Sequence, residues 1–220
     1  MLIIIQARSD SKRFPNKVYS KIKNKTLLEN IIDALKPLGL KICICSTKRD
    51  IDKKIKIISK KNNCFFFGGN KNDVLKRIYD CAIKFKASEI IRINGDSPLI
   101  SEYLIVEAIK YKKKYPDHDI ITNVYPRTFP RGMSVEIIKT KCLKNLRSFN
   151  LSKSNKEHVT EFIYNNPKFF KIKNFRLSKD FSNINLSVDT KEDLSFVKNK
   201  KKSFKNIKNY KELTSIILEI

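Results

Sequence analysis

The 220-residue sequence predicts an α/β fold in three layers around a mostly parallel sheet. Short, continuous apolar runs, of which Leu2–Ile5 is the first, are typical of strands buried on both faces. Amphipathic segments with helical spacing separate these runs, and strands joined by helices pair in parallel. The hydrophobic fraction of 41% is enough for the core of one domain, expected to span residues 1–220.

The first half of the chain alternates regularly between strand and helix. The helix that starts at Thr26 has a capping box with Glu29 and ends near Pro37 and Gly39. A second strand, Leu40–Ser46, follows. Beyond it we expect helices at 50–61, 73–85 and 102–111, and strands at 64–67, 89–93 and 120–123.

The second half alternates less regularly. We expect strands at 134–138, 169–175 and 184–188, and helices at 139–146, 156–165, 191–197 and 210–218. Ser154 and Glu157 have the spacing of a capping box at the start of the 156–165 helix. The lysine-rich segment 198–208 is expected to be solvated.

Composition narrows the classes of function. The formal net charge is +25, but the excess is mostly lysine spread along the whole chain. No recognition helix, zinc-finger spacing or aromatic platform accompanies it, so a nucleic-acid partner is not expected. No apolar run of 18 residues and no signal peptide is visible, so we expect no membrane partner and a cytoplasmic location. Cys43 and Cys45 alternate with isoleucines, which indicates small buried hydrophobes in a reduced compartment rather than zinc ligands.

The loop after the first strand carries the strongest chemical pattern. Pro15 prevents a helix here, so a buried strand leads into an extended loop with four cations, Arg8, Lys12, Arg13 and Lys17. Ligands of α/β folds bind beyond the carboxyl ends of the strands, where a cationic, hydroxyl-bearing loop suits a polyphosphate. Neither GxxxxGK[ST] nor GxGxxG is present. The residues alone leave a solvated basic loop equally open, because cations are common everywhere in this chain.

This loop resembles the N-terminal signature of sugar-nucleotide cytidylyltransferases. The pattern is closest to the spore-coat polysaccharide type, whose relatives activate KDO and acylneuraminic acids with CTP. The matching residues are Ile4, Ile5, Gln6, Ala7, Arg8, Ser11, Arg13, Pro15 and Lys17. Asn16 stands where the family has glycine, and asparagine tolerates left-handed backbone better than most residues.

The resemblance implies a Rossmann-like nucleotidyltransferase fold and a nucleotide site in this loop. The residues that it assigns to nucleotide binding are Gln6, Ala7, Arg8, Ser11, Arg13 and Lys17. Three of them, Arg8, Arg13 and Lys17, would act in catalysis by holding the β- and γ-phosphates as pyrophosphate leaves.

Two further blocks imply a metal site. The stretch NGDSPLI, with Asn94, Gly95 and Asp96, resembles the family element GDxPLI, and LSVDTKEDL resembles VDTPEDL. The residues alone allow both aspartates to begin a turn or cap a helix. The resemblance makes Asp96 and Asp189 ligands of Mg²⁺, which takes one or two carboxylates together with phosphate oxygens. It also places Asn94 and Gly95 beside the nucleotide.

The remaining blocks concern the base and the acceptor. The stretch GNKNDVLKRIYDCA resembles GxxxDVLxRY and puts Asp73 and Arg77 near the nucleotide, although a capped helix explains it equally well. YPRTFPRGMSVEI resembles LPRTYPDGLDVEV, and KEHVTEFI resembles REHVTPYI. The residues that these two blocks assign to acceptor binding are Arg127, Glu136, Glu157 and His158. Arg131 and Ser134 replace two family aspartates, which implies either a different or more acidic acceptor or lost activity.

The resemblance covers Leu2 to about Leu194 in blocks that follow the family's order. It implies transfer of CMP from CTP to a sugar or acidic sugar, with Mg²⁺ and pyrophosphate release, for surface polysaccharide. Three alternatives stay open: another nucleoside triphosphate, a glycosyltransferase of related fold, and a basic binding protein without turnover. The sequence fixes neither the acceptor nor the number of metal ions, and it leaves a homodimer open.

Overall fold

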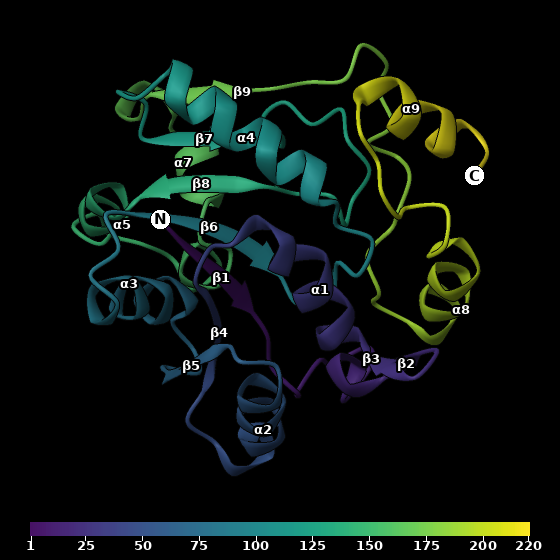
Figure 1. Ribbon diagram of the computed structural model, residues 1–220. Coiled ribbons are helices and arrows are strands. Elements are labelled where there is room, and N and C mark those ends of the chain that lie inside the picture. Colours follow the sequence, from purple (N-terminus) through teal and green to yellow (C-terminus); the bar gives the residue numbers. More distant parts are fainter.

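A seven-stranded sheet runs through the computed structural model, which describes residues 1–220 (Figure 1). Its strands are β1 (Leu2–Gln6), β4 (Ile42–Thr47), β5 (Phe65–Gly69), β6 (Glu89–Asn94), β7 (Ile120–Thr122), β8 (Glu136–Lys139) and β9 (Ile172–Asn174). Across the sheet they lie in the order β5-β4-β1-β6-β8-β7-β9, and β8 is the strand that runs against its neighbours. The mostly parallel sheet is therefore confirmed.

Helices cover both faces of this sheet, so the three layers are confirmed as well (Figure 1). On one face lie α1 (Leu27–Leu35), α2 (Lys53–Lys61) and α4 (Glu102–Lys114). On the other lie α3 (Val74–Lys84), α5 (Thr140–Leu146), α6 (Lys153–Glu157) and α7 (Glu161–Asn165). The sheet thus has one hydrophobic core on each face. The last two helices, α8 (Lys191–Lys200) and α9 (Tyr210–Leu218), pack into the first core, the one that contains α1, α2 and α4.

Side chains alternate along β1 and so contribute to the hydrophobic cores on both faces of the sheet. Ile3 and Ile5 point into the core with α1 and α4, whereas Leu2 and Ile4 point into the core with α3 and α5. Cys43 joins the second core and is fully buried, as its position between isoleucines predicts. The capping box that begins α1 is also confirmed.

Short elements complete the chain. They are the hairpin strands β2 (Lys21–Ile22) and β3 (Lys25–Thr26), and the 3₁₀ turns η1 (Lys17–Tyr19), η2 (Lys36–Leu38), η3 (Asp50–Asp52) and η4 (Pro167–Phe169). The hairpin and these turns were not predicted, because two or three residues are too few for a periodic pattern. No helix has both the length and the apolar character needed to cross a membrane.

The segment 184–188 is not the strand that its alternating residues predict. Its backbone pairs instead with two loops: Arg131 donates to Ile184 and accepts from Leu186, and Val188 donates to Asp96 at 2.8 Å. Leu186 and Val188 are fully buried, so the alternation correctly indicates burial. This segment therefore ties the end of the chain to the loop after β6.

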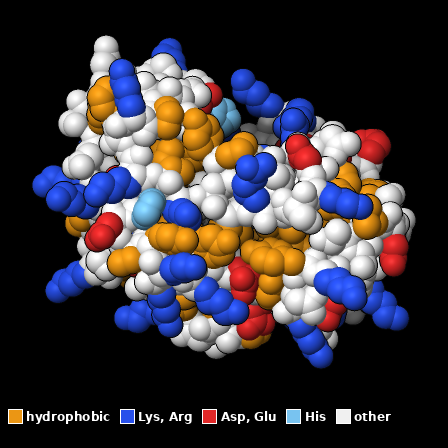
Figure 2. Space-filling view, turned by 90° about the horizontal axis from the view of Figure 1, so that it is seen from above, with side chains coloured by type: hydrophobic (Ala, Val, Ile, Leu, Met, Phe, Trp, Pro, Cys, Tyr) orange, Lys and Arg blue, Asp and Glu red, His pale blue; other side chains and the backbone are white.

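Two other expectations for the second half were wrong. The 156–165 helix is split into α6 and α7, and the cap of α6 is Ser152 with Asn155 rather than Ser154 with Glu157. The 198–208 segment is not simply solvated, because Phe204 is buried in the core. Lysine and arginine side chains are scattered over the face shown in Figure 2 rather than gathered in one patch.

Candidate active site

A buried aspartate shapes the loop that follows β1. Asp52, from η3, accepts hydrogen bonds at Oδ1 from the backbone N–H and the hydroxyl of Ser9, at 2.8 and 2.7 Å. Burial opposes ionisation of Asp52, but hydrogen bonds from Thr47 and Ser9 outweigh it and hold its pKa below the usual value. Asn16 closes the loop with φ 61°, the left-handed conformation expected where the family has glycine.

Lys17 lies at the centre of a charged cluster beyond the carboxyl ends of β1 and β6. Its side chain passes under the loop, and the residue is only 8% exposed. The ammonium nitrogen lies 2.9 Å from Asp96 Oδ2, 2.9 Å from Asp189 Oδ1 and 2.8 Å from the carbonyl oxygen of Val188. Three predicted site residues from distant parts of the sequence therefore meet at one atom.

Backbone contacts fix the two aspartates beside each other. The backbone N–H of Val188, the residue before Asp189, donates a hydrogen bond to the backbone carbonyl oxygen of Asp96. Gly95 lets the loop after β6 approach β1, since a Cβ there would lie 2.7 Å from the carbonyl oxygen of Gln6 and 2.9 Å from Ala7 Cβ. The predicted residues Gln6, Ala7 and Gly95 thus form the floor under the cluster, with half-buried Asn94 beside Gln6 on β6.

The two arginines of the loop are also held by carboxylates. Arg13 Nη2 lies 2.9 Å from Asp189 Oδ2, and its side chain is 69% exposed. Arg8 Nη2 lies 2.8 Å from Glu157 Oε1, which connects the loop to the end of α6. All three cations assigned to phosphate binding are therefore paired with acidic side chains at the crevice. Ser11, the remaining predicted residue, is half-buried on the same loop.

Asp96 and Asp189 fit the chemistry of a magnesium site. Each presents an oxygen to the same ammonium nitrogen, so one cation can contact both carboxylates. They do not belong to a larger group of three or more histidine, cysteine or acidic side chains. Mg²⁺ is usually bound by one or two carboxylates and completed by water and substrate phosphates, which matches this donor set.

The predicted acceptor residues make no hydrogen bond or ion pair with one another. Arg127 Nη2 donates to Ser134 Oγ at 3.0 Å, so the serine that replaces a family aspartate contacts this arginine. His158 is exposed at the junction of α6 and α7, next to Glu157. Glu136, in contrast, is 2% exposed and turned into the protein.

The Glu136 carboxylate is fully occupied by protein groups. Its Oε2 pairs with Arg92, and its Oε1 accepts from Thr160 Oγ1 at 2.7 Å and Tyr164 Oη at 2.6 Å. Burial opposes ionisation, yet the charge of Arg92 and the hydroxyl hydrogen bonds hold the pKa of Glu136 below its usual value. The same surroundings, burial and the neighbouring Glu136, raise the pKa of Tyr164 well above its usual value.

Asp73 and Arg77 lie apart from the Lys17 cluster, on α3 below β5. Asp73 caps α3 by accepting from the Lys76 backbone N–H at 2.7 Å. Arg77 is fully buried under Gly69 and donates to the carbonyl of Asn70 at 2.7 Å. Its other two nitrogens, Nε and Nη2, have no hydrogen-bond partner in the protein.

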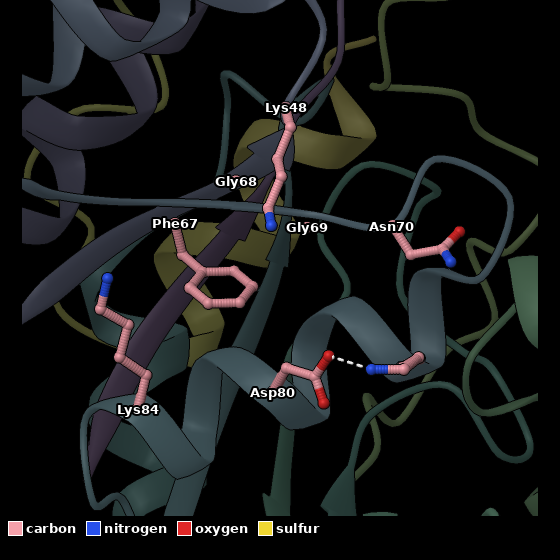
Figure 3. Close-up of a pocket in the computed structure, with 8 residues that line it drawn as sticks. Lys48, Phe67, Gly68, Gly69, Asn70, Asp80 and Lys84 are labelled. Carbon is pink, nitrogen blue, oxygen red and sulfur yellow. Dashed lines mark hydrogen bonds and ion pairs between the residues drawn. The ribbon is translucent and has the colours of Figure 1, made fainter.

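Two hollows lie outside the Lys17 cluster. A groove of about 440 Å³ between β5 and α3 contains Gly68 and Gly69 at its top, with Lys48 and Lys84 beside it and Asp80 paired to a lysine of α3 (Figure 3). A cavity of about 990 Å³ lies between the β2–β3 hairpin, α1, the start of α4 and residues 201–208. The candidate site is therefore marked by its convergent charges rather than by the size of a cavity.

Sequence reasoning missed four residues that support the site. They are Arg49, Asp52, Arg92 and Tyr164. Arg92 carried a usable signal, because it is the one cation in the otherwise apolar centre of β6, Ile90–Ile93. Arg49 pairs with Asp52 and with Asp10 of the loop, and Asp52 holds Ser9. No local pattern marks these residues or Tyr164, because the groups that they hold at the site are remote in the sequence.

Comparison with known proteins agrees with this geometry. The family model described as cytidylyltransferase matches residues 2–220. An uncharacterised protein of Methanocaldococcus jannaschii is 31% identical over 91% of this chain and 83% of its own length. The spore coat polysaccharide biosynthesis protein of Bacillus subtilis strain 168 is 26% identical over 90% of this chain and 85% of its own length.

The fold agrees as well. A solved cytidylyltransferase structure from Leptospira borgpetersenii superposes with a TM-score of 0.89 at 28% identity, covering 99% of this chain and 93% of that one. The Rossmann-like nucleotidyltransferase fold is therefore confirmed. Because the family model matches nearly the whole chain, this protein belongs to the cytidylyltransferase family of CTP-using nucleotidyltransferases.

Proposed function

We propose that the protein transfers the cytidine monophosphate group of CTP to an oxygen of a sugar or acidic sugar, with Mg²⁺ as cofactor. The observation that carries this proposal is the convergence of Lys17, Asp96 and Asp189 on one point beyond the carboxyl ends of β1 and β6. Phosphoryl-type transfer needs positioning and charge neutralisation more than covalent help from the protein. A cluster of cations and carboxylates at this point supplies both.

The proposed reaction exchanges one phosphorus–oxygen bond for another. A hydroxyl or phosphate oxygen of the acceptor attacks the α-phosphorus of CTP. As the new bond forms, the bond from the α-phosphorus to the oxygen that bridges to the β-phosphate breaks, and its electron pair leaves with pyrophosphate. When a hydroxyl attacks, its proton is released to water, and the products are a CMP-sugar and pyrophosphate. When a phosphate oxygen of a sugar phosphate attacks, the products are a CDP-sugar and pyrophosphate.

The loop cations hold the leaving group in this proposal. When bound at Asp96 and Asp189, Mg²⁺ would neutralise phosphate charge. Arg8, Arg13 and Lys17 then exchange their carboxylate partners for phosphate oxygens, which leaves Asp96 and Asp189 to the metal ion and frees Glu157 for the acceptor. Arginine can grip phosphate oxygens with two parallel donors, and lysine acts as a compact charge.

The acceptor side follows from the same crevice. Arg127, Glu157 and His158 are the proposed acceptor contacts, and Glu136 supports them from within the core. The B. subtilis relative's name supports an activated sugar for surface polysaccharide. We expect the chain to work in the cytoplasm as a single domain over residues 1–220, and a homodimer remains open.

The test is pyrophosphate release with each of the four nucleoside triphosphates, Mg²⁺ and a panel of acidic sugars, neutral sugars and sugar phosphates. The proposal predicts release with CTP and one class of acceptor. Release with another triphosphate would leave the proposed mechanism unchanged but would show that the enzyme uses a nucleotide with a base other than cytosine. Release that depends on a nucleotide-sugar donor and yields no pyrophosphate would contradict the proposed transfer.

A further inference from the structure

A row of polar side chains crosses the three strands β6, β8 and β7 on one face of the sheet. The preceding row is apolar: Leu2, Ile90, Ile138 and Ile120 lie opposite one another and are buried in the α3–α5 core. Two residues closer to the carboxyl ends of the parallel strands, Arg92 lies opposite Glu136, and Glu136 lies opposite Thr122. On β1 the residue opposite Arg92 is the buried Ile4. Because side chains alternate along a strand, Gln6, two residues further along β1, points to the same face.

Arg92 joins this row to Gln6. One of its nitrogens, Nη1, is paired with Glu136, and the other two, Nε and Nη2, donate to Gln6 Oε1 at 3.3 and 3.2 Å. Thr160 and Tyr164 hold the remaining oxygen of Glu136. The guanidinium is therefore fixed from one side by a buried carboxylate and offers its other edge to Gln6.

This contact decides which way the Gln6 amide faces. The guanidinium has only donors, so the amide oxygen must face Arg92 and the amide nitrogen must face away from it. Gln6 Nε2 has no hydrogen-bond partner in the protein, although Gln6 is half-buried at the carboxyl end of β1. The amide nitrogen is thus an oriented donor without an acceptor, one residue from the loop that carries Arg8 and Lys17.

We propose that Gln6 donates from Nε2 to an acceptor oxygen or ring nitrogen of the bound nucleotide, and that Arg92, held by Glu136, is a positioning residue that orients Gln6. This inference rests on the proposed function, because the nucleotide is its ligand. It assigns Glu136 a role behind the site rather than in contact with the acceptor. It also gives both members of the buried Arg92–Glu136 ion pair a function, since Glu136 holds Arg92 and Arg92 orients Gln6.

The experiment is calorimetric titration of CTP, with Mg²⁺ present, into four chains: wild type, Gln6→Ala, Arg92→Lys and the double variant. Lysine can keep the pair with Glu136 but cannot also place two donors on Gln6. Loss of one hydrogen bond to a charged ligand weakens Kd by about tenfold. We expect about that loss in Gln6→Ala and a smaller loss in Arg92→Lys.

The decisive comparison is the double variant. If Arg92 acts through Gln6, then Arg92→Lys has no further effect in the Gln6→Ala background, and the two losses are not additive. Fully additive losses, or an unchanged Kd in Gln6→Ala, would overturn the inference. If the wild-type chain bound no CTP, the proposed function itself would fail, which separates the two failures.

Two further variants guard against a merely structural effect. Gln6→Glu keeps an oxygen toward Arg92 and removes the donor, so it should weaken the binding of CTP as Gln6→Ala does. In turnover, we expect the KM for CTP to rise by a larger factor than kcat falls. Glu89→Gln removes a partner of Lys112 at the other end of β6, 3.1 Å away, and does not touch Gln6. We expect it to lower the melting temperature without changing the Kd for CTP; an equal change in Kd would contradict the positioning role.

Discussion

Two charged clusters lie at the same edge of the sheet and differ in how their charges are satisfied. In the Lys17 cluster, the side chains of Asp96 and Asp189 are 28% and 25% exposed, so solvent and ligands can reach them. In the Arg92 cluster, the side chain of Glu136 is 3% exposed and both of its oxygens are taken by protein donors. We call the Lys17 cluster open, because its carboxylates can exchange partners with solvent and ligands. We call the Arg92 cluster, which consists of Arg92 and Glu136, closed, because Glu136 cannot.

The difference separates chemistry from support. A carboxylate that must bind a metal ion or release an arginine needs an open side, because the exchange happens at that side. A carboxylate that must hold a guanidinium still needs the opposite, since a buried charge with all its hydrogen bonds made resists movement. Four predictions test this contrast.

The largest expected effect comes from breaking the closed pair. Arg92→Met leaves the Glu136 carboxylate buried and unpaired, which should lower the free energy of unfolding by about 3–5 kcal/mol. Arg92→Met combined with Glu136→Met removes both charges and should recover most of that loss. Urea unfolding measures both. A double variant as unstable as the single one would show that the cost is not the unpaired charge.

Removing the central cation of the open cluster should affect turnover more than stability. We expect Lys17→Met to lower the rate of pyrophosphate release by about 10²–10³-fold, the usual cost of losing one preorganised charge at a reacting phosphate or oxyanion. Lys12→Met is the matched control, because Lys12 is an exposed lysine of the same loop without an ion pair. Equal losses in both variants would contradict the role of the cluster.

The closed cluster should also affect how the free energy of unfolding depends on pH in acid. Because the pKa of Glu136 is lower in the folded state, its ionised form stabilises the fold above the ordinary pKa of 4.5, and this stabilisation is lost as the pH falls through the folded value. The stability of Glu136→Gln should therefore depend less on pH in this acid range. Urea unfolding from about pH 6 to about pH 3 would test it. Parallel pH curves for variant and wild type would contradict it.

The smallest effect is expected at the exposed rim of the open cluster. Arg13→Gln should change the free energy of unfolding by less than about 1 kcal/mol, because exposed ion pairs contribute little. It should raise the KM for CTP by about tenfold if Arg13 binds phosphate. Arg176→Gln, which removes the same charge from an exposed site elsewhere, controls for the overall field. Equal KM changes would assign the effect to net charge alone.

The open cluster could be predicted from the sequence, whereas the closed one could not. Resemblance to the family motifs assigned Lys17, Asp96 and Asp189 to one site, whereas the residues alone also allowed the aspartates to begin a turn or cap a helix. Their positions after buried strands or apolar segments agree with that site, because the carboxyl ends of parallel strands meet at one edge. Arg92 and Glu136 form their pair through the antiparallel register of β6 and β8. Register between strands that are remote in the sequence is not visible in local periodicity, so Glu136 was assigned to the acceptor on its motif alone.

The fold shows the same limit. Apolar runs located the seven strands of the sheet, because burial of a strand leaves a local pattern. The segment that ends at Val188 leaves that pattern too, but its backbone bonds to Arg131 and Asp96 instead of to a strand. Alternation indicates that side chains are buried and says nothing about which backbone lies alongside.

The most direct test of the contrast measures two quantities on two variants, Asp96→Asn in the open cluster and Glu136→Gln in the closed one. Pyrophosphate release from CTP and urea unfolding are recorded for both beside the wild type. We predict that Asp96→Asn loses turnover while unfolding near the wild-type urea concentration, and that Glu136→Gln unfolds at lower urea while the folded chain keeps measurable turnover. An active Asp96→Asn chain, or a Glu136→Gln chain as stable as the wild type, would contradict the division between a cluster for chemistry and a cluster for support.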